Sequence, residues 1–102
     1  MKSQQITNSS IRIVKPGSEI GLAEIEKEIL ESLSASEILL DLSDMDYINS
    51  AFIGLLLRIK NERPTAYRKI KLVNPNEIVG EILSMTQVDR IFEIQKIYPT
   101  AW

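Results

Sequence analysis

A short polar pair, Asn49-Ser50, directly precedes an apolar run and is the place where this sequence could support chemistry. Residues 51 to 57 are apolar apart from one glycine, which is typical of a helix that starts at Ser50 and packs into a core. A serine at a helix start can accept an N–H from the first turn as the N-cap. The same hydroxyl could instead carry a phosphate, because a helix N-terminus favours negative charge. Spacing leaves both roles of Ser50 open.

The rest of the sequence offers few catalytic or metal-binding groups. With no His and no Cys, the chain lacks the usual general base near neutral pH, the commonest metal ligand, a thiol nucleophile and any disulfide. Asp41, Asp44 and Asp46 lie close together but lack the glycine and the terminal Glu of a calcium loop. The glycines are too scattered for a phosphate-binding loop. We therefore expect no metal, no cofactor and no enzymatic activity.

Charge is nearly balanced overall but unevenly distributed. The chain has 12 Lys and Arg against 14 Asp and Glu, a net charge of −2, so nothing indicates direct binding of nucleic acid. Residues 19 to 46 are strongly acidic, whereas residues 58 to 71 hold half of the bases: Arg58, Lys60, Arg63, Arg68, Lys69 and Lys71. These segments are either solvated faces of opposite sign or, alternatively, a docking patch for a charged protein.

The apolar runs are too short to span a bilayer, and the N-terminal residues lack the apolar stretch of a signal peptide. We expect a cytoplasmic protein without membrane insertion.

Hydrophobic periodicity predicts alternating strands and helices within the 102 residues. Leu22, Ile25, Ile29 and Leu33 recur at helical spacing, whereas the run at 38 to 42 is typical of a central strand. The expected strands are 3–7, 10–14, 38–42, 69–73 and 91–95, and the expected helices are 19–34, one from Ser50 to about residue 60, and one starting near residue 75.

Such alternation builds a parallel α/β sheet with crossover helices. We predict one domain over residues 1–102, with a core at about 4–96 and an irregular tail at 97–102. The fold class is α/β, with a mixed, mostly parallel sheet of about five strands and three helices, in which an opening hairpin supplies the antiparallel pair. Asn74-Pro75-Asn76-Glu77 predicts a helix start with Asn74 as N-cap and Pro75 at the first helical position.

Two segments carry a resemblance to a known family. Residues 38–56, read as ILLDLSDMDYINSAFIGLL, resemble the signature of the STAS domain family, a strand ending in Asp-Leu-Ser and then Asp-Ser-Ser-Gly-Leu-Gly at a helix start. The segments Leu72-Val73-Asn74-Pro75 and 88–94 are similar to the fourth strand and the final strand region of the family. The resemblance covers roughly residues 4–96 and implies a STAS-like fold.

The family includes the bacterial anti-sigma factor antagonists, and the resemblance to this type implies a function. In those proteins the first serine of the motif is phosphorylated by a partner that is both kinase and anti-sigma factor, and a phosphatase resets the switch. Ser50 occupies the matching position. The resemblance thus implies a regulator of transcription that works by partner switching. Asn49, Ala51, Phe52 and Ile53 are its expected docking residues around Ser50.

The match departs from the family pattern at three positions: Asn49 replaces Asp, Ala51 replaces the second Ser, and Phe52 replaces Gly. Phe52 would then project toward a partner or shield Ser50. Two alternatives therefore accompany the switch hypothesis. One is a STAS scaffold subunit that is not phosphorylated and packs within a larger, including a membrane-associated, assembly. The other is binding of a nucleotide or small anion at the start of the helix at Ser50.

Overall fold

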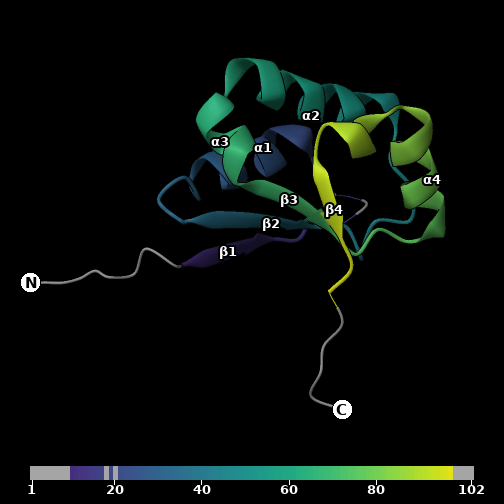
Figure 1. Cartoon of the computed structure of the whole chain (residues 1–102), viewed down its shortest axis with the longest axis horizontal. Coiled ribbons are helices and arrows are strands. Elements are labelled where there is room, and N and C mark those ends of the chain that lie inside the picture. Colours follow the sequence, from purple (N-terminus) through teal and green to yellow (C-terminus); the bar gives the residue numbers. More distant parts are fainter. Residues whose placement is uncertain (1–9, 18, 20, 98–102) are drawn as a thin grey trace, which may run out of the picture.

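A computed structural model describes residues 10–17, 19 and 21–97. The elements follow the order β1 (Ile11–Val14), α1 (Leu22–Leu30), β2 (Glu37–Asp41), α2 (Ser50–Glu62), α3 (Pro64–Lys69), β3 (Ile70–Val73), α4 (Glu77–Met85), a short 3-10 turn (Val88–Arg90) and β4 (Glu93–Gln95) (Figure 1). The described strands form one sheet in the order β1-β2-β3-β4, and every neighbouring pair is parallel. The predicted α/β class is confirmed.

The two faces of this sheet differ in burial. Ile38 and Leu40 of β2 pair in register with Ile70 and Leu72 of β3, and all four side chains are buried against the helices. The opposite face is open: Ile13 of β1 is 62% exposed. A parallel sheet with helices on one face has its core between the helices and the sheet. The carboxyl ends of β2 and β3, where the chain leaves toward α2 and α4, lie at the edge of this core.

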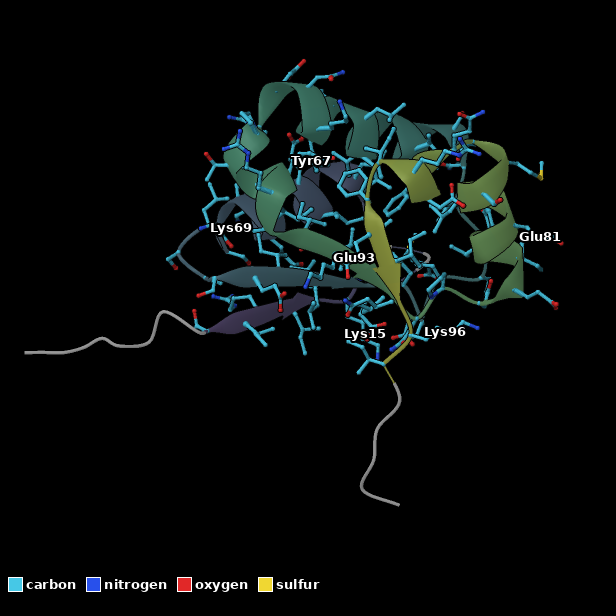
Figure 2. The ribbon with its side chains drawn as sticks, viewed as in Figure 1. Lys15, Tyr67, Lys69, Glu81, Glu93 and Lys96 are labelled. Carbon is cyan, nitrogen blue, oxygen red and sulfur yellow. The ribbon has the colours of Figure 1, made fainter. Side chains whose placement is uncertain are left out.

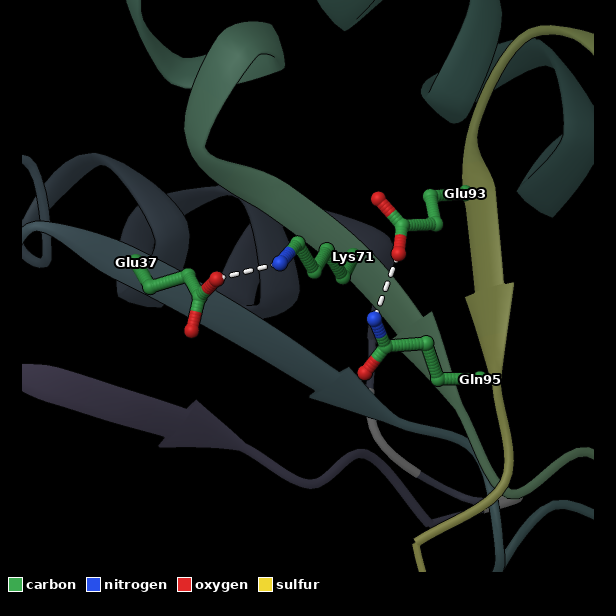
Figure 3. A network of polar contacts seen from close by, with 4 residues as sticks. All are labelled: Glu37, Lys71, Glu93 and Gln95. Carbon is green, nitrogen blue, oxygen red and sulfur yellow. Dashed lines mark hydrogen bonds and ion pairs between the residues drawn. The ribbon is translucent and has the colours of Figure 1, made fainter.

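Polar side chains cross the open face (Figure 3). The ammonium group of Lys71 on β3 lies 2.5 Å from a carboxylate oxygen of Glu37 on β2, and Gln95 donates to Glu93 along β4. The hydrogen bond that Lys71 donates to Glu37 raises the pKa of Lys71 above its ordinary 10.5, and the charge of Glu93 adds to the effect. Opposite charges on adjacent strands therefore support the register of the open face.

The structure corrects several predicted elements. The helix expected at 19–34 is α1, Leu22–Leu30, and the strand expected at 91–95 is β4, Glu93–Gln95. Helix α3 was not predicted, because it is a polar and charged helix of six residues with a Pro in its first turn. The strand expected at 3–7, which alone made the predicted sheet mixed, lies outside the described residues. Among the described residues the sheet has the four strands given above.

Asn74 does not cap α4, so that prediction is wrong. Its backbone has a φ of 57°, its N–H continues the sheet by donating to the carbonyl of Gln95, and its Oδ1 accepts from the N–H of Ile97 at 2.7 Å. Asn74 thus ends β3 and binds the chain that leaves β4. The helix begins at Glu77, with Asn76 as the cap.

Candidate functional site

The connection between β2 and α2 carries the predicted site. Met45 and Ile48 are buried and anchor this connection to the core. The N–H of Met45 donates to the carbonyl of Leu42, and Asp41 Oδ1 accepts from the N–H of Ser43 at 3.0 Å. The loop is thus held at both ends of its path, and the residues between the anchors are left at the surface.

The cap of α2 is Asn49 and not Ser50. Asn49 Oδ1 accepts from the N–H of Phe52 at 3.0 Å, and the Asn49 carbonyl accepts from the N–H of Ile53 at 3.1 Å. Ser50 is the first helical residue and is exposed. Within the described part of the chain, no hydrogen bond engages its hydroxyl. One of the two roles predicted for Ser50, the N-cap, is therefore wrong, because the preceding amide side chain already performs it.

The predicted docking residues fall into different environments. Ala51 is exposed beside Ser50, and Ile53 is half-buried against the core. Phe52 is only 2% exposed, so the prediction that its ring faces a partner or shields Ser50 is corrected. The helix starts with its third residue facing inward, and a large apolar ring there is most stable in the core.

A small pocket lies between the starts of α1 and α2, with Tyr47 and Asn49 at its polar side. Its volume is about 100 Å³, and its lining is Leu22, Ile25, Met45, Tyr47, Ile48, Asn49 and Phe52. Sites for drug-sized ligands usually measure about 300–1,000 Å³. This pocket is too small for a nucleotide, whereas binding of a small anion at this helix start stays a prediction.

Asn76 connects α4 to the same loop. Its Oδ1 accepts from the N–H of Val79 at 2.7 Å and so caps α4. Its Nδ2 donates to the carbonyls of Met45, at 3.1 Å, and Asp46, at 3.3 Å. This role of Asn76 was not predicted from the sequence. The signal was the second Asn of Asn74-Pro75-Asn76, which is an equally good cap by residue type.

A second depression lies at the carboxyl ends of the strands. Its volume is about 470 Å³, and it is lined by Lys15, Asp41, Ser43, Asn74, Pro75, Lys96 and Ile97. Figure 2 shows Lys15 and Lys96 at this edge of the sheet. Lys15 lies 3.8 Å from Asp44, an exposed pair that contributes little stability.

Three of the six bases between Arg58 and Lys71 have hydrogen-bond or ion-pair partners within the described chain. Arg58 pairs with Glu26 of α1 at 2.6 Å, Lys69 donates to the carbonyl of Leu33 at 2.5 Å, and Lys71 contacts Glu37. The acidic and basic segments are thus joined at Arg58–Glu26 and Lys71–Glu37, while Lys60, Arg63 and Arg68 are exposed, so both interpretations of the basic segment stay predictions.

None of the helices in residues 21–97 is both long and apolar enough to cross a membrane. No group of three acidic side chains in the described part is arranged to hold a metal ion.

Comparisons with known proteins agree on one family. The model of the STAS domain matches residues 4–101. A protein of Thermotoga neapolitana, provisionally named an anti-sigma factor antagonist homolog, is 40% identical over 65 residues. A Thermotoga maritima protein, provisionally named an anti-sigma factor antagonist, is 38% identical over the same length. Each match covers 64% of this chain but only 55% of the relative, so it spans little more than half of the relative's length.

Solved structures share the fold. A crystal structure from Thermotoga maritima, also described provisionally as an anti-sigma factor antagonist, gives a TM-score of 0.62 at 24% identity and covers 92% of this chain and 84% of its own. An NMR structure of the same protein gives a TM-score of 0.64 at 26% identity, with coverage of 89% and 76%.

Proposed function

The chain belongs to the STAS domain family, and from this premise we propose that it is an anti-sigma factor antagonist whose Ser50 is the phosphorylation switch. In this proposal the unphosphorylated chain docks on a kinase that is also the anti-sigma factor, and the phosphorylated chain is released. The two Thermotoga relatives, provisionally named as antagonists, support this type over other members of the family. The chain acts in the cytoplasm of a bacterium and catalyses nothing itself.

One observation carries the proposal: Ser50 is exposed, and its hydroxyl makes no hydrogen bond to the described residues. Asn49 caps α2, so a kinase can modify Ser50 without removing a hydrogen bond that holds the helix. A phosphate on the first helical residue also lies close to the free N–H groups and the positive end of the helix dipole. The modified chain therefore keeps its fold, as a reversible switch requires.

Charge accounts for the direction of the switch. A phosphate adds about −1.5 to −2 charges near neutral pH. In a docked kinase this group faces the diphosphate left by the donor nucleotide, and burying both negative groups costs several kcal/mol unless new cations pair with them. The phosphorylated chain consequently dissociates faster than the unphosphorylated one.

The test is affinity purification of the tagged chain from its source organism. Wild type and Ser50→Ala are expected to retain an ATP-binding kinase, and Ser50→Asp is expected to lose about 90% or more of it. Ser34→Asp is the matched control, because Ser34 is also exposed but lies in the turn after α1. Peptide mass spectrometry of the wild type should locate phosphate on Ser50.

Two results would contradict the proposal. Phosphate on a different residue, with none on Ser50, would remove the switch. If all variants retain the same assembly and that assembly contains no kinase, the chain is the scaffold subunit of the alternative hypothesis, and Ser50 is a surface residue without a regulatory role.

A further inference from the structure

The hydrogen bonds of Asn76 join two surface segments that are distant in the sequence. Its Nδ2 reaches the carbonyls of Met45 and Asp46, and its Oδ1 caps α4, so the loop before Ser50 is fixed to the first turn of α4. Tyr47 follows this junction by one residue on the loop side, and Ile78 follows it by two residues on the helix side. Consecutive Cα atoms are about 3.8 Å apart, so both residues start close to the junction.

Both of these residues expose large apolar side chains. Tyr47 is 59% exposed and Ile78 is 58% exposed. Their neighbours Met45, Ile48 and Val79 are buried in the core, whereas Ile78 stays exposed and Tyr47 borders the small pocket between α1 and α2. Two exposed apolar side chains beside a rigid junction, three residues before Ser50 on the loop, are typical of the centre of a protein contact.

The surroundings of this pair are acidic. The chain has no Lys or Arg between residues 28 and 57 or between residues 72 and 89, and these two segments contain the whole loop and α4. Asp44, Glu77 and Glu81 are exposed within them, and Figure 2 shows Glu81 on the outer side of α4. Two bases lie at its border: Lys15, 3.8 Å from Asp44, and Lys96, which lines the depression beside Pro75, so the acidic groups still outnumber the bases. A partner that covers the pair therefore meets a field of net negative charge.

We propose that Tyr47 and Ile78, held by Asn76, form the apolar centre of the docking surface, and that the partner presents an apolar pocket bordered by Lys and Arg side chains. The inference rests on the proposed function, since it identifies the surface and the partner chemistry for the same contact. It moves the docking centre from buried Phe52 to the junction between the loop and α4.

The acidic field also gives the contact a property that a purely apolar surface lacks. Association with a basic rim is steered by charge, so the association rate falls as salt screens the field. The apolar centre is desolvated only in the complex, so truncation of Tyr47 or Ile78 acts on dissociation. The two parts of the surface can therefore be separated by kinetics.

The experiment uses the kinase recovered with the wild-type chain, purified and immobilised for surface plasmon resonance. Tyr47→Ala and Ile78→Ala are each expected to raise Kd about tenfold or more, mainly through faster dissociation. Met85→Ala is the matched control, because Met85 is 79% exposed at the other end of α4, and its Kd should stay within about twofold of wild type. Each variant is compared by circular dichroism to confirm its fold.

Charge is tested in the same way. Glu81→Lys is expected to slow association about fivefold or more and to flatten its salt dependence, whereas Glu62→Lys at the far end of α2 should not. Asn76→Asp keeps an oxygen for the α4 cap but removes both donors to the loop. In this variant the amide hydrogens of the loop should exchange faster with solvent, while the N–H of Val79 stays protected. Its Kd should rise, as expected for Tyr47→Ala and Ile78→Ala.

Outcomes separate this inference from the proposed function. If the kinase binds and Ser50→Asp releases it, but Tyr47→Ala and Ile78→Ala bind like Met85→Ala, the docking centre lies elsewhere and only this inference fails. Association that speeds up as salt is added would overturn the basic rim. If no kinase is recovered at all, the proposed function fails, and this inference fails with it.

Discussion

The starts of α2 and α4 are built from the same parts and yet differ in what they leave free. Each helix begins after an Asn whose Oδ1 accepts from the N–H three residues on, and in each case that residue is buried: Phe52 under Asn49 and Val79 under Asn76. The difference is the amide nitrogen. Asn76 uses it to hold the loop at Met45 and Asp46, whereas among the described residues the Asn49 amide nitrogen has no such partner.

This difference shows how one helix start can hold a neighbouring loop in place while the other leaves a serine accessible. The start of α4 is hydrogen-bonded to the loop before α2 and holds that loop in place. The cap of α2 bonds within its own first turn, and Ser50 beside it is exposed. A regulatory serine gains from this arrangement, because a modification there disturbs one helix turn and no long-range contact.

The largest expected effect comes from the buried residue under each cap. Phe52→Ala should lower the free energy of unfolding by about 3–5 kcal/mol, and Val79→Ala by about 2 kcal/mol, because the ring removes more buried carbon and leaves the larger cavity. Urea denaturation followed by circular dichroism measures both. A loss under about 1 kcal/mol for Phe52→Ala would return this ring to the surface and restore it as a docking residue.

The next effect distinguishes the two caps themselves. Asn49→Ala should cost about 1 kcal/mol, the usual value of one cap hydrogen bond. Asn76→Ala should cost about 2 kcal/mol, because the loop carbonyls of Met45 and Asp46 lose their donor as well. Equal losses in urea denaturation would mean that the bonds to the loop contribute nothing, and the contrast between the two helix starts would then rest on geometry alone.

Much of this organisation was predictable from local sequence patterns. The periodicity of Leu22, Ile25 and Ile29 predicted α1, and the short apolar runs predicted β2 and β3. These patterns are readable because the buried face of a helix or strand determines where its apolar residues recur. The start of α2 at Ser50 was also predicted correctly. The parallel sheet followed from the alternation of these elements.

The remaining features depend on contacts that a local pattern does not contain. Residues 51–57 are apolar on every side of the helix, so their spacing could not tell that Phe52 faces inward. Asn76 bonds across 30 and 31 residues, and neither capping preference nor turn chemistry encodes such a partner. Residue type predicts Asn74 as the cap, but its Oδ1 accepts from the N–H of Ile97 and its backbone has a φ of 57°, so its contact with the chain after β4 overrides the local preference.

A smaller effect sharpens the comparison by adding charge at one cap. Asn49→Asp restores the residue type that the family pattern has at this position, keeps the cap and places a carboxylate at the positive end of α2, so stability should rise by about 0.3–1 kcal/mol. The matched control is Asn61→Asp in the last turn of the same helix, where the dipole disfavours the carboxylate and stability should fall by a similar amount.

The gain from Asn49→Asp also has a predicted pH dependence. A carboxylate stabilised by the helix has a pKa below its unfolded value of about 3.9, so the gain is present above that pH and is lost as the pH falls through the folded pKa. Thermal denaturation between pH 7 and pH 3 measures it. A gain that persists in acid would have to come from the hydrogen bond and not from charge.

The smallest effect is expected at Ser50 itself. Ser50→Ala should change the free energy of unfolding by less than about 0.5 kcal/mol, since the hydroxyl is exposed, makes no hydrogen bond within the described residues, and alanine suits a helix at least as well. Urea denaturation of Ser50→Ala and Asn49→Ala compares the loss of an exposed hydroxyl with the loss of the helix cap. A loss at Ser50 that equals the loss at Asn49 would mean that the two side chains share the cap. Phosphorylation would then weaken α2, and release from a partner could follow from a frayed helix rather than from charge at an intact surface.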